Sequence, residues 1–290
     1  MVGLRMPELA EVEYYKRRWA PAVGATIRAV RLNRRNRVFR GTDPGSLERH
    51  LPGRDFRAAD ARGKQMAFRF GSDGWLGIHL GMAGRLLRER RKEYPRHKHD
   101  HLVLETDSEV LVFRDTRYFG RIRWHEGADP PPWWTGAGPD LLSPAYTRTV
   151  LERTLRRRPR TPVKSLLLDQ AHFPGLGNWM ADEILWRAEI HPATLPGDLD
   201  DAAVKRLYRR IREVCRDAIR VIAPDWSPPP SSWLFPHRWK DGGTCPKTGR
   251  PLERIRIAGR TACFSPARQQ APASHDRKAP DYRKPTAAAG

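Results

Sequence analysis

Cysteine is scarce in this chain, and long apolar runs are missing from it. The sequence of 290 residues holds 3 cysteines, an odd number that makes no disulfide framework and indicates a reducing compartment. No apolar stretch reaches the roughly 18 residues that a membrane-spanning helix needs, and no signal peptide precedes the helical pattern that starts near Glu8. We therefore expect a cytoplasmic protein with no membrane partner.

Acidic residues are also few relative to basic ones. The chain has 33 Asp and Glu against 54 Lys and Arg, a formal net charge of +21. Such an imbalance predicts a polyanionic partner, with nucleic acid as the first candidate and an anionic membrane as the second. The arginine-rich codon usage of a GC-rich genome is the alternative explanation of the charge.

The apolar pattern predicts a helix followed by strands in the first part of the chain. Leu9, Val12 and Trp19 recur at near-helical spacing, which predicts a helix over residues 8–20 with Pro7 at its first position. From about residue 25 to 125 apolar residues alternate with polar ones, as in the run 66–70, and turn signals such as Asp73-Gly74 separate the runs. This part is predicted to be mostly β.

Two proline-rich breaks divide the rest of the chain. Neither a helix nor a central strand is expected within 129–139 or within 227–230. Between these breaks the apolar period changes to 3.6, and we predict one helical stripe, beside which Cys215 lies as a small core residue. The predicted domains are 6–128, 138–226 and 231–269, and the composition of 270–290 predicts disorder. The stripe consists of Val204, Leu207, Ile211, Val214 and Ala218.

Two of the four motifs that carry candidate chemistry lie near the start of the chain. Pro7-Glu8 opens the first motif, which read alone is an ordinary helix start, with proline early and carboxylates near the positive end of the dipole. Lys64 follows Arg62-Gly63 on a predicted β-turn. It is suitably placed to reach a phosphate, although most turn lysines are simply solvated.

The other two motifs place glycines beside large side chains. The runs HLGMAG at 79–84 and RDTRYFG at 114–120 lie at predicted strand ends, where a Met or Phe could enter a base stack as a wedge. Tight turns with core packing are the alternative. The run PGLGN at 174–178 would expose helix N–H groups to a phosphate, or Asn178 could simply cap the helix.

Taken together, these motifs resemble the formamidopyrimidine-DNA glycosylase/endonuclease VIII family of base excision repair enzymes. The resemblance runs from residue 6 to 269 and includes MPEL at 6–9, GPDLL at 138–142 and IHP at 190–192. It implies an α+β multidomain fold: an N-terminal two-sheet β-sandwich with an N-terminal helix, a helix–two-turn–helix domain, and a C-terminal β-hairpin finger.

The resemblance also implies an activity and a set of site residues. The expected protein is a bacterial, nucleoid-associated monomer without a cofactor, a DNA glycosylase and AP lyase acting on double-stranded DNA that contains oxidised bases or abasic sites. Pro7 matches the nucleophile, Glu8 the acid/base, and Lys64, His79 and Asn178 the positions that hold phosphates around the extruded nucleotide. The residues matching those that fill the vacated stack or grip the backbone are Met82, Arg117, Phe119 and Arg260.

The expected chemistry depends on where the chain begins. A terminal proline is a secondary amine that can attack C1′ of a sugar, whereas an internal proline is a tertiary amide. We therefore expect initiation at Met6 and loss of that methionine. If residues 1–5 are retained, the amine is blocked, and the alternative is a catalytically silent binder of damaged or abasic DNA. A basic RNA-associated protein would explain the charge but not Pro7-Glu8 together with the wedge motifs.

The finger departs from the family pattern. Many members carry Cys-x-x-Cys twice, but here the four positions are Cys245, Thr248, Ser265 and Arg268. Three thiolates of a tetrahedral zinc site are therefore lost, and we predict a finger without metal. We expect packing to hold it and Gln269 to suit DNA contact; a Cys245–Cys263 disulfide stays open. Whether purine or pyrimidine lesions are preferred is also open. The packing residues are predicted to be Trp233, Phe235, Trp239 and Phe264.

Overall fold

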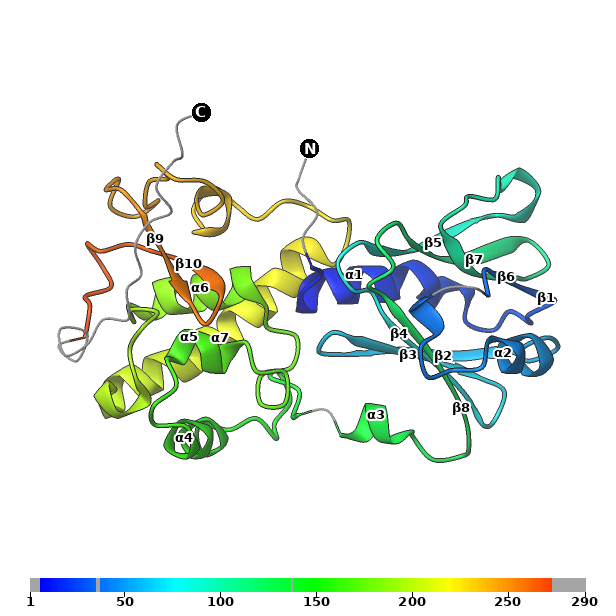
Figure 1. The fold of residues 1–290 in the computed structure, drawn as a ribbon, viewed down its shortest axis with the longest axis horizontal. Coiled ribbons are helices and arrows are strands. Elements are labelled where there is room, and N and C mark those ends of the chain that lie inside the picture. Colours follow the sequence, from blue (N-terminus) through cyan, green and yellow to red (C-terminus); the bar gives the residue numbers. More distant parts are fainter. Residues whose placement is uncertain (1–5, 35–36, 137, 273–290) are drawn as a thin grey trace. The chain divides into compact units, whose positions relative to one another are not determined.

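The computed structural model describes residues 6–34, 37–136 and 138–272. The fold is α+β, as predicted, and the chain divides into two compact units (Figure 1). The first unit comprises the described residues up to 140 together with 216–228, and the second comprises 141–215 with the described residues from 229 onward. Helix α7, Asp201–Ile222, therefore contributes residues to both.

The first unit is a sandwich of two antiparallel four-stranded sheets. One sheet has the order β1-β6-β7-β5 and the other β2-β3-β4-β8. The predicted alternation at 66–70 is confirmed in β3, where Met66, Phe68 and Phe70 are all fully buried in the core between the sheets. The strands are β1 Ala29–Leu32, β2 Phe56–Arg62, β3 Gln65–Phe70, β4 Gly74–His79, β5 Gly84–Arg90, β6 Asp100–Glu105, β7 Glu109–Asp115 and β8 Arg121–Glu126.

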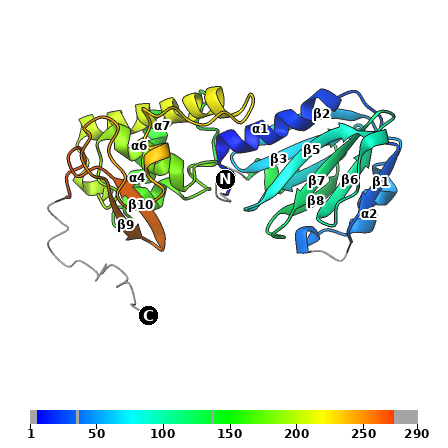
Figure 2. The same ribbon diagram turned by 90° about the horizontal axis from the view of Figure 1, so that it is seen from above.

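Helix α1 closes one side of this sandwich. It contacts β5 and β2, which are edge strands of different sheets (Figure 2). Trp19 lies at its end, fully buried, and its indole N–H donates to the carbonyl of Leu87 in β5 (2.9 Å). The helices and 3-10 turns of this unit are α1 Leu9–Trp19, η1 Ala20–Ala22, η2 Arg37–Phe39, α2 Pro44–His50, η3 Arg91–Glu93 and α3 Pro132–Thr135.

Two local predictions in this unit are wrong. Pro7 is not the first helical residue, because Glu8 is the N-cap of α1 and has extended backbone angles. The break at 129–139 does contain a helix, the single turn α3. Its prolines occupy the N-cap and first helical positions, where an N–H would be unbonded in any case, so they are compatible with helix initiation.

The second unit combines helices with a hairpin. The apolar stripe predicted for α7 is confirmed, since Leu207, Ile211 and Val214 are fully buried, as is the neighbouring Cys215. The elements are α4 Arg148–Arg157, α5 Val163–Leu167, α6 Asn178–Ala188, η4 Pro196–Asp198, α7, η5 Phe235–His237, β9 Glu253–Ile257 and β10 Arg260–Phe264. Strands β9 and β10 form the predicted two-stranded hairpin.

Residues 273–290, most of the predicted disordered tail, lie outside the described residues. Within the described ranges, every helix is too short or too polar to cross a lipid bilayer.

Candidate active site and nucleic-acid interface

Two connections between the sheets of the first unit lie at the same end of the sandwich. Residues 80–83 lead from His79 in β4 to β5, and residues 116–120 lead from β7 to Arg121 in β8. His79 and Arg121 are direct register partners, and Gly84 pairs with Asp115 where both connections meet the other sheet. Met82 lies in the first connection; Arg117 and Phe119 lie in the second. The structure therefore brings together the predicted wedge residues.

Lys64 lies at this same end. Gly63 and Lys64 form a two-residue turn between β2 and β3, and Arg62 pairs with Gln65, which in turn pairs with His79. Gly63 has φ 61° at the first turn position, a conformation that glycine adopts without strain. The predicted turn lysine is confirmed as a turn residue, half-buried beside the end of β4.

His79 is held as a neutral ring. Its Nδ1 accepts a hydrogen bond from the backbone N–H of Gly81 (3.0 Å), so the proton of the neutral imidazole is on Nε2. Burial, reinforced by the positive charges of Lys64 and Arg123, lowers the pKa of His79 to about 4. At neutral pH this side chain can donate one uncharged N–H to an anion at the end of the sheet.

Asp115 organises the 116–120 connection, a role that sequence analysis missed. Its buried carboxylate accepts the backbone N–H groups of Arg117 (2.9 Å) and Gly120 (2.7 Å). Arg40, directly after η2, supports the same loop by donating to the carbonyl of Gly120 (2.6 Å). In the sequence this carboxylate sits inside the predicted wedge motif, but nothing there shows that it points back into its own loop.

The tip of that connection is exposed and strained. Phe119 is 43% exposed, and the Arg117 guanidinium carbon lies 5.1 Å from the centroid of its ring. Tyr118 has φ 60°, unusual for a residue with a Cβ, and its hydroxyl lies 3.1 Å from Nδ1 of His99. A large apolar ring and a cation are therefore presented together on a fixed loop.

Pro7 and Glu8 lie toward this end of the sandwich as well. Trp19 at the C-terminal end of α1 contacts Leu87, and Tyr15 one turn earlier lies close enough to Arg85 for that charge to act on its phenol. The N-terminal end of α1 therefore lies toward Gly84, the first residue of β5. Both Pro7 and Glu8 are buried, and the Glu8 N–H donates to Oε2 of Glu11 (3.2 Å).

In the second unit, Asn178 joins a helix to the hairpin. Gly177 is the N-cap of α6, so the interpretation of Asn178 as a capping residue is wrong. Its side-chain amide donates to the carbonyl of Thr261 in β10 (3.0 Å), while its Oδ1 is buried and has no hydrogen-bond partner among the described residues. The carbonyl of Asn178 accepts from Nζ of the fully buried Lys164 (2.8 Å).

Arg260 lies at the tip of the hairpin, exposed, directly after a two-residue turn. Ala258 and Gly259 have φ 46° and 75°, as a primed hairpin turn requires. Gln269, in contrast, does not face outward as expected. It is 1% exposed, donates to the carbonyl of Ile190 (2.8 Å) and accepts from the N–H of Ser265 (2.9 Å), so its amide fastens the end of the finger and is not available to DNA.

The base of the finger is packed around cysteine side chains. Cys245 and Cys263 are free thiols in one buried cluster with Trp186, Leu234 and Leu252. Among the described residues, no group of three or more His, Cys, Asp or Glu is placed to hold a metal ion. Of the aromatic residues expected to hold the finger, Phe235 packs against Trp179 of α6 (ring centroids 4.9 Å apart) and Phe264 packs against His191 (4.5 Å).

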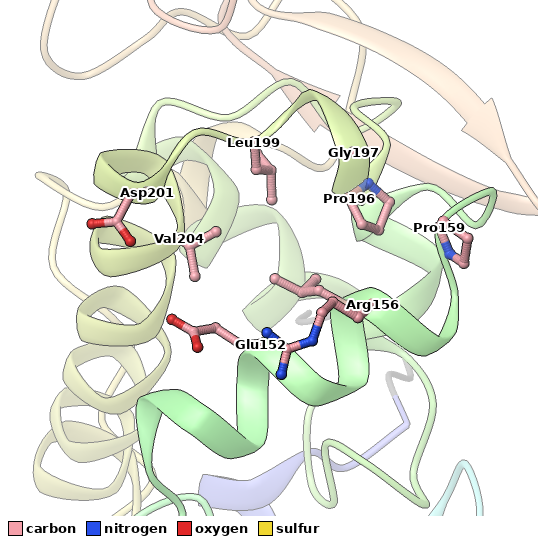
Figure 3. A pocket seen from close by; sticks show the side chains of 9 residues that line it. Glu152, Arg156, Pro159, Pro196, Gly197, Leu199, Asp201 and Val204 are labelled. Atoms are coloured by element: carbon pink, nitrogen blue, oxygen red, sulfur yellow. The ribbon is translucent and has the colours of Figure 1, made fainter.

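A cavity of about 440 Å³ lies within the second unit (Figure 3). It is bounded by α4, η4 and the start of α7, and none of the predicted site residues lines it. Its carboxylates, Glu152 and Asp201, are both ion-paired with Arg148. The cavity therefore offers no unpaired acid–base couple of the kind that bond cleavage needs.

Comparison with known proteins agrees with the motif-based assignment. A model of the formamidopyrimidine-DNA glycosylase N-terminal domain matches residues 6–122, and a model of the formamidopyrimidine-DNA glycosylase H2TH domain matches residues 137–225. A Pelobacter propionicus protein named formamidopyrimidine-DNA glycosylase is 36% identical over 274 residues, covering 91% of this chain and 100% of the relative. The chain belongs to the formamidopyrimidine-DNA glycosylase/endonuclease VIII family.

Solved structures give the same result. Two crystal structures of the Lactococcus lactis formamidopyrimidine-DNA glycosylase match with TM-scores of 0.81 and 0.82, each at 28% identity and covering 91% of this chain and 100% of that one. In the first the relative is bound to DNA containing an AP site, and in the second to DNA containing FAPY-dG.

Proposed function

We propose that this protein is a bifunctional DNA glycosylase and AP lyase that removes oxidised bases through an imine on Pro7. One observation carries the proposal: Pro7 and Glu8 lie at the end of the sandwich where Lys64, His79 and the exposed Phe119 loop also lie. One unit therefore holds a candidate nucleophile, a carboxylic acid, hydrogen-bond donors for a phosphate, and an aromatic side chain large enough to fill the place of a base.

The location of Pro7 suits nucleophilic attack. It immediately precedes the N-cap of α1, where the positive end of the helix dipole favours the neutral, nucleophilic form of an amine over the protonated form. The lesion must leave the duplex stack before attack. The amine then bonds to C1′ and the base departs with the glycosidic electron pair. The C1′–O4′ bond of the sugar ring then opens as Glu8 protonates O4′, which leaves a cationic imine between Pro7 and C1′. The cationic imine acidifies the C2′ proton, so β-elimination, followed or not by δ-elimination, breaks the strand.

The DNA-contact roles follow from the same placement. Lys64 and His79 donate to phosphates beside the extruded nucleotide, and Met82, Arg117 and Phe119 fill the vacated stack and meet the opposite base. In the second unit, Asn178 and Arg260 contact the backbone. The finger works without zinc, because Thr248, Ser265 and Arg268 cannot replace three thiolates. Metal analysis of protein purified without chelator tests this, and stoichiometric zinc would contradict it.

The mechanism requires Pro7 to be the first residue of the mature chain. The match to the family's N-terminal domain begins at residue 6, which supports initiation at Met6. Mass analysis of the protein from its native host should show a chain that begins at Pro7. A chain that retains residues 1–5 would instead support the silent-binder alternative.

Borohydride trapping is the decisive experiment. The chain beginning at Pro7 should form a covalent complex with duplexes that contain an abasic site, FAPY-dG, 8-oxoguanine or thymine glycol, and the pattern across this panel will identify the preferred lesion. The matched control is the same protein with residues 1–5 retained, which should bind the abasic duplex without trapping. Equal trapping by the control, or by Pro7→Gly, would reject the nucleophile assignment.

A further inference from the structure

Three side chains that can donate hydrogen bonds to an anion share the outer face of the sheet β2-β3-β4-β8, at the end that carries the connections. His79 of β4 pairs with Arg121 of β8, and Gly77 pairs with Arg123. Ile122, between the two arginines, is fully buried in the core between the sheets. Because successive side chains of a strand point to opposite faces, Arg121 and Arg123 lie on the outer face beside His79.

A tryptophan of α3 lies against one of these arginines. Gly77 leaves room for it, since a Cβ at Gly77 would lie 2.6 Å from the ring of Trp133. The guanidinium carbon of Arg123 lies 5.6 Å from the centroid of the same ring. An aromatic face attracts a guanidinium through its quadrupole and does not use the N–H groups, which lie in the guanidinium plane. Arg123 is therefore held in a way that leaves its donors for an anion.

The charges around His79 are positive. Burial lowers the pKa of the His79 ring, and four nearby cations lower it further. Burial and the repulsion by two of these cations also lower the pKa of Arg123. Like charges at this spacing repel one another, so the group is better suited to hold an anion than to stand alone. The four cations are Lys64, Arg40, Arg121 and Arg123.

The carboxylates of the described residues that could balance these charges are engaged or distant. Asp115 acts on Arg40, but it already accepts two N–H groups of its own loop. On the outer face of the sheet, the strand register places Asp60 in the same row as Arg123. Asp60 lies on β2, three strands away, which is a separation of about 14 Å. The acids near this face therefore leave its arginines without a counter-charge.

Arg121 also has a donor without an acceptor. Its side chain is half-buried, and its Nε is fully buried with no hydrogen-bond partner among the described residues. One of its terminal nitrogens lies beside Gly41, where a Cβ would come within 3.1 Å of it. A buried donor that stays unpaired is costly, and the planar fork of a guanidinium matches a phosphate well. Arg121 is thus suited to receive an oxygen from outside the protein.

We propose that Arg121 and Arg123 together bind a phosphate of the DNA backbone, next to the phosphate that His79 and Lys64 contact. The inference rests on the proposed function, because it requires damaged duplex to lie against this end of the sandwich. A DNA backbone suits the cluster because it supplies consecutive phosphates with one charge each. Trp133 acts as a positioning residue for Arg123.

The salt dependence of binding tests this contact. Affinity is measured for a duplex that carries a tetrahydrofuran abasic analogue, between about 50 and 200 mM salt. The double variant Arg121→Gln, Arg123→Gln should bind about tenfold or more weakly at the lower salt concentration. Its log–log slope should be shallower than that of the wild type by about 0.9, since one phosphate is no longer neutralised.

Arg69→Gln is the matched control. Arg69 lies on the same outer face at the other end of the sheet, and its guanidinium carbon lies 4.9 Å from the ring centroid of its register partner Trp75. It therefore removes one charge from the same kind of environment, and it should keep the wild-type slope. An unchanged slope in the double variant, or an equal change in Arg69→Gln, would overturn the proposal.

Unfolding of the free protein separates a contact with DNA from support of the fold. Because neighbouring cations repel Arg121 and its Nε is unpaired, Arg121→Gln should unfold in urea at or above the wild-type midpoint. Arg121→Lys keeps the charge and should keep the wild-type salt slope. A midpoint of Arg121→Gln clearly below that of the wild type, or a slope that Arg121→Lys does not restore, would contradict the phosphate contact.

These measurements do not depend on bond cleavage, because the abasic analogue has no C1′ electrophile for Pro7. A wild type that fails to trap in borohydride, with slopes that change as expected, would reject the lyase and leave the phosphate site. Normal trapping with an unchanged slope in the double variant would reject the phosphate site alone.

Discussion

Gly81 controls how closely the two sheet-to-sheet connections approach each other. Its φ is +64°, and a Cβ built there would lie 2.4 Å from the carbonyl carbon of Phe119. A second positive-φ glycine, Gly53, has φ +81° but meets no heavy atom of the described residues within 4 Å. Alanine at Gly53 would therefore show the cost of the positive φ alone, and alanine at Gly81 would show that cost together with a steric clash.

Gly81→Ala should therefore destabilise the protein more than Gly53→Ala. The positive φ costs about 1–2 kcal/mol in either variant, and the clash with the Phe119 backbone adds about 1–3 kcal/mol only at Gly81. Urea unfolding measures both. Gly81→Ala should also weaken binding to abasic DNA if the proposed contacts of Arg117 and Phe119 are right, since the 116–120 connection must shift. Equal losses of stability in the two variants would show that the 80–83 and 116–120 connections can move apart without an energetic cost.

His79 should make stability depend on pH. Its folded pKa, about 4, lies below the ordinary value of 6.5 because burial and the neighbouring cations disfavour the protonated ring. The resulting stabilisation is fully present above about pH 6.5 and is lost as pH falls toward 4, with an upper limit of about 3 kcal/mol. In urea unfolding between these pH values, His79→Gln should lose less stability than the wild type. His97→Gln, in an exposed loop, should behave like the wild type.

Single residues were predictable where their neighbours in the chain determine the geometry. Lys64 is a turn residue because Gly63 precedes it, and β-strand alternation identified the buried face of β3. Asp115 and Gln269 were beyond sequence reasoning. Asp115 accepts N–H groups of its own loop, and Gln269 donates to Ile190. The contact of Asp115 depends on the conformation of a loop with no periodic pattern. The contact of Gln269 depends on the folding together of segments that are distant in the chain.

The 116–120 connection acts as one element because a single buried carboxylate holds it. Asp115→Ala would leave the N–H groups of Arg117 and Gly120 without this acceptor, which should cost about 2–4 kcal/mol in unfolding free energy. Asp107→Ala, at the exposed β6–β7 turn where Asp107 pairs with Arg28, should cost less than about 1 kcal/mol. Lesion-DNA affinity should fall only in the first variant; a similar fall in both would contradict this role.

Elements with a clear period were predicted well, and short ones were not. The strands, α1 and α7 follow from alternation or from a helical stripe. The sequence does not predict α3, because proline is expected to break a helix, whereas three successive prolines here precede and begin a helical turn. The side chain of Asn178 makes it a possible N-cap in the sequence, but Gly177 is the N-cap of α6 and the Asn178 amide bonds to Thr261 instead.

For the whole molecule, the +21 charge predicts strong salt dependence of DNA binding. The logarithm of the binding constant should fall linearly with that of salt concentration, by about 0.9 for each phosphate neutralised. Arg260→Ala should make this slope shallower by about 0.9. Arg250→Ala removes the same charge at the opposite end of the hairpin and should leave the slope nearly unchanged. Identical slopes in the wild type and Arg260→Ala would exclude a phosphate contact by Arg260.

The buried carboxylate of Asp182 links three parts of the second unit. It pairs with Lys164 of α5 and with Arg238, and it accepts the backbone N–H of Cys263 in β10 (3.2 Å). Removing one member of such a pair typically costs about 3–5 kcal/mol. The hairpin is thus rigid before any duplex arrives, so little conformational entropy is left to lose on docking. Slow deuterium uptake at the Cys263 amide of the unbound protein would be the signature of this preorganisation.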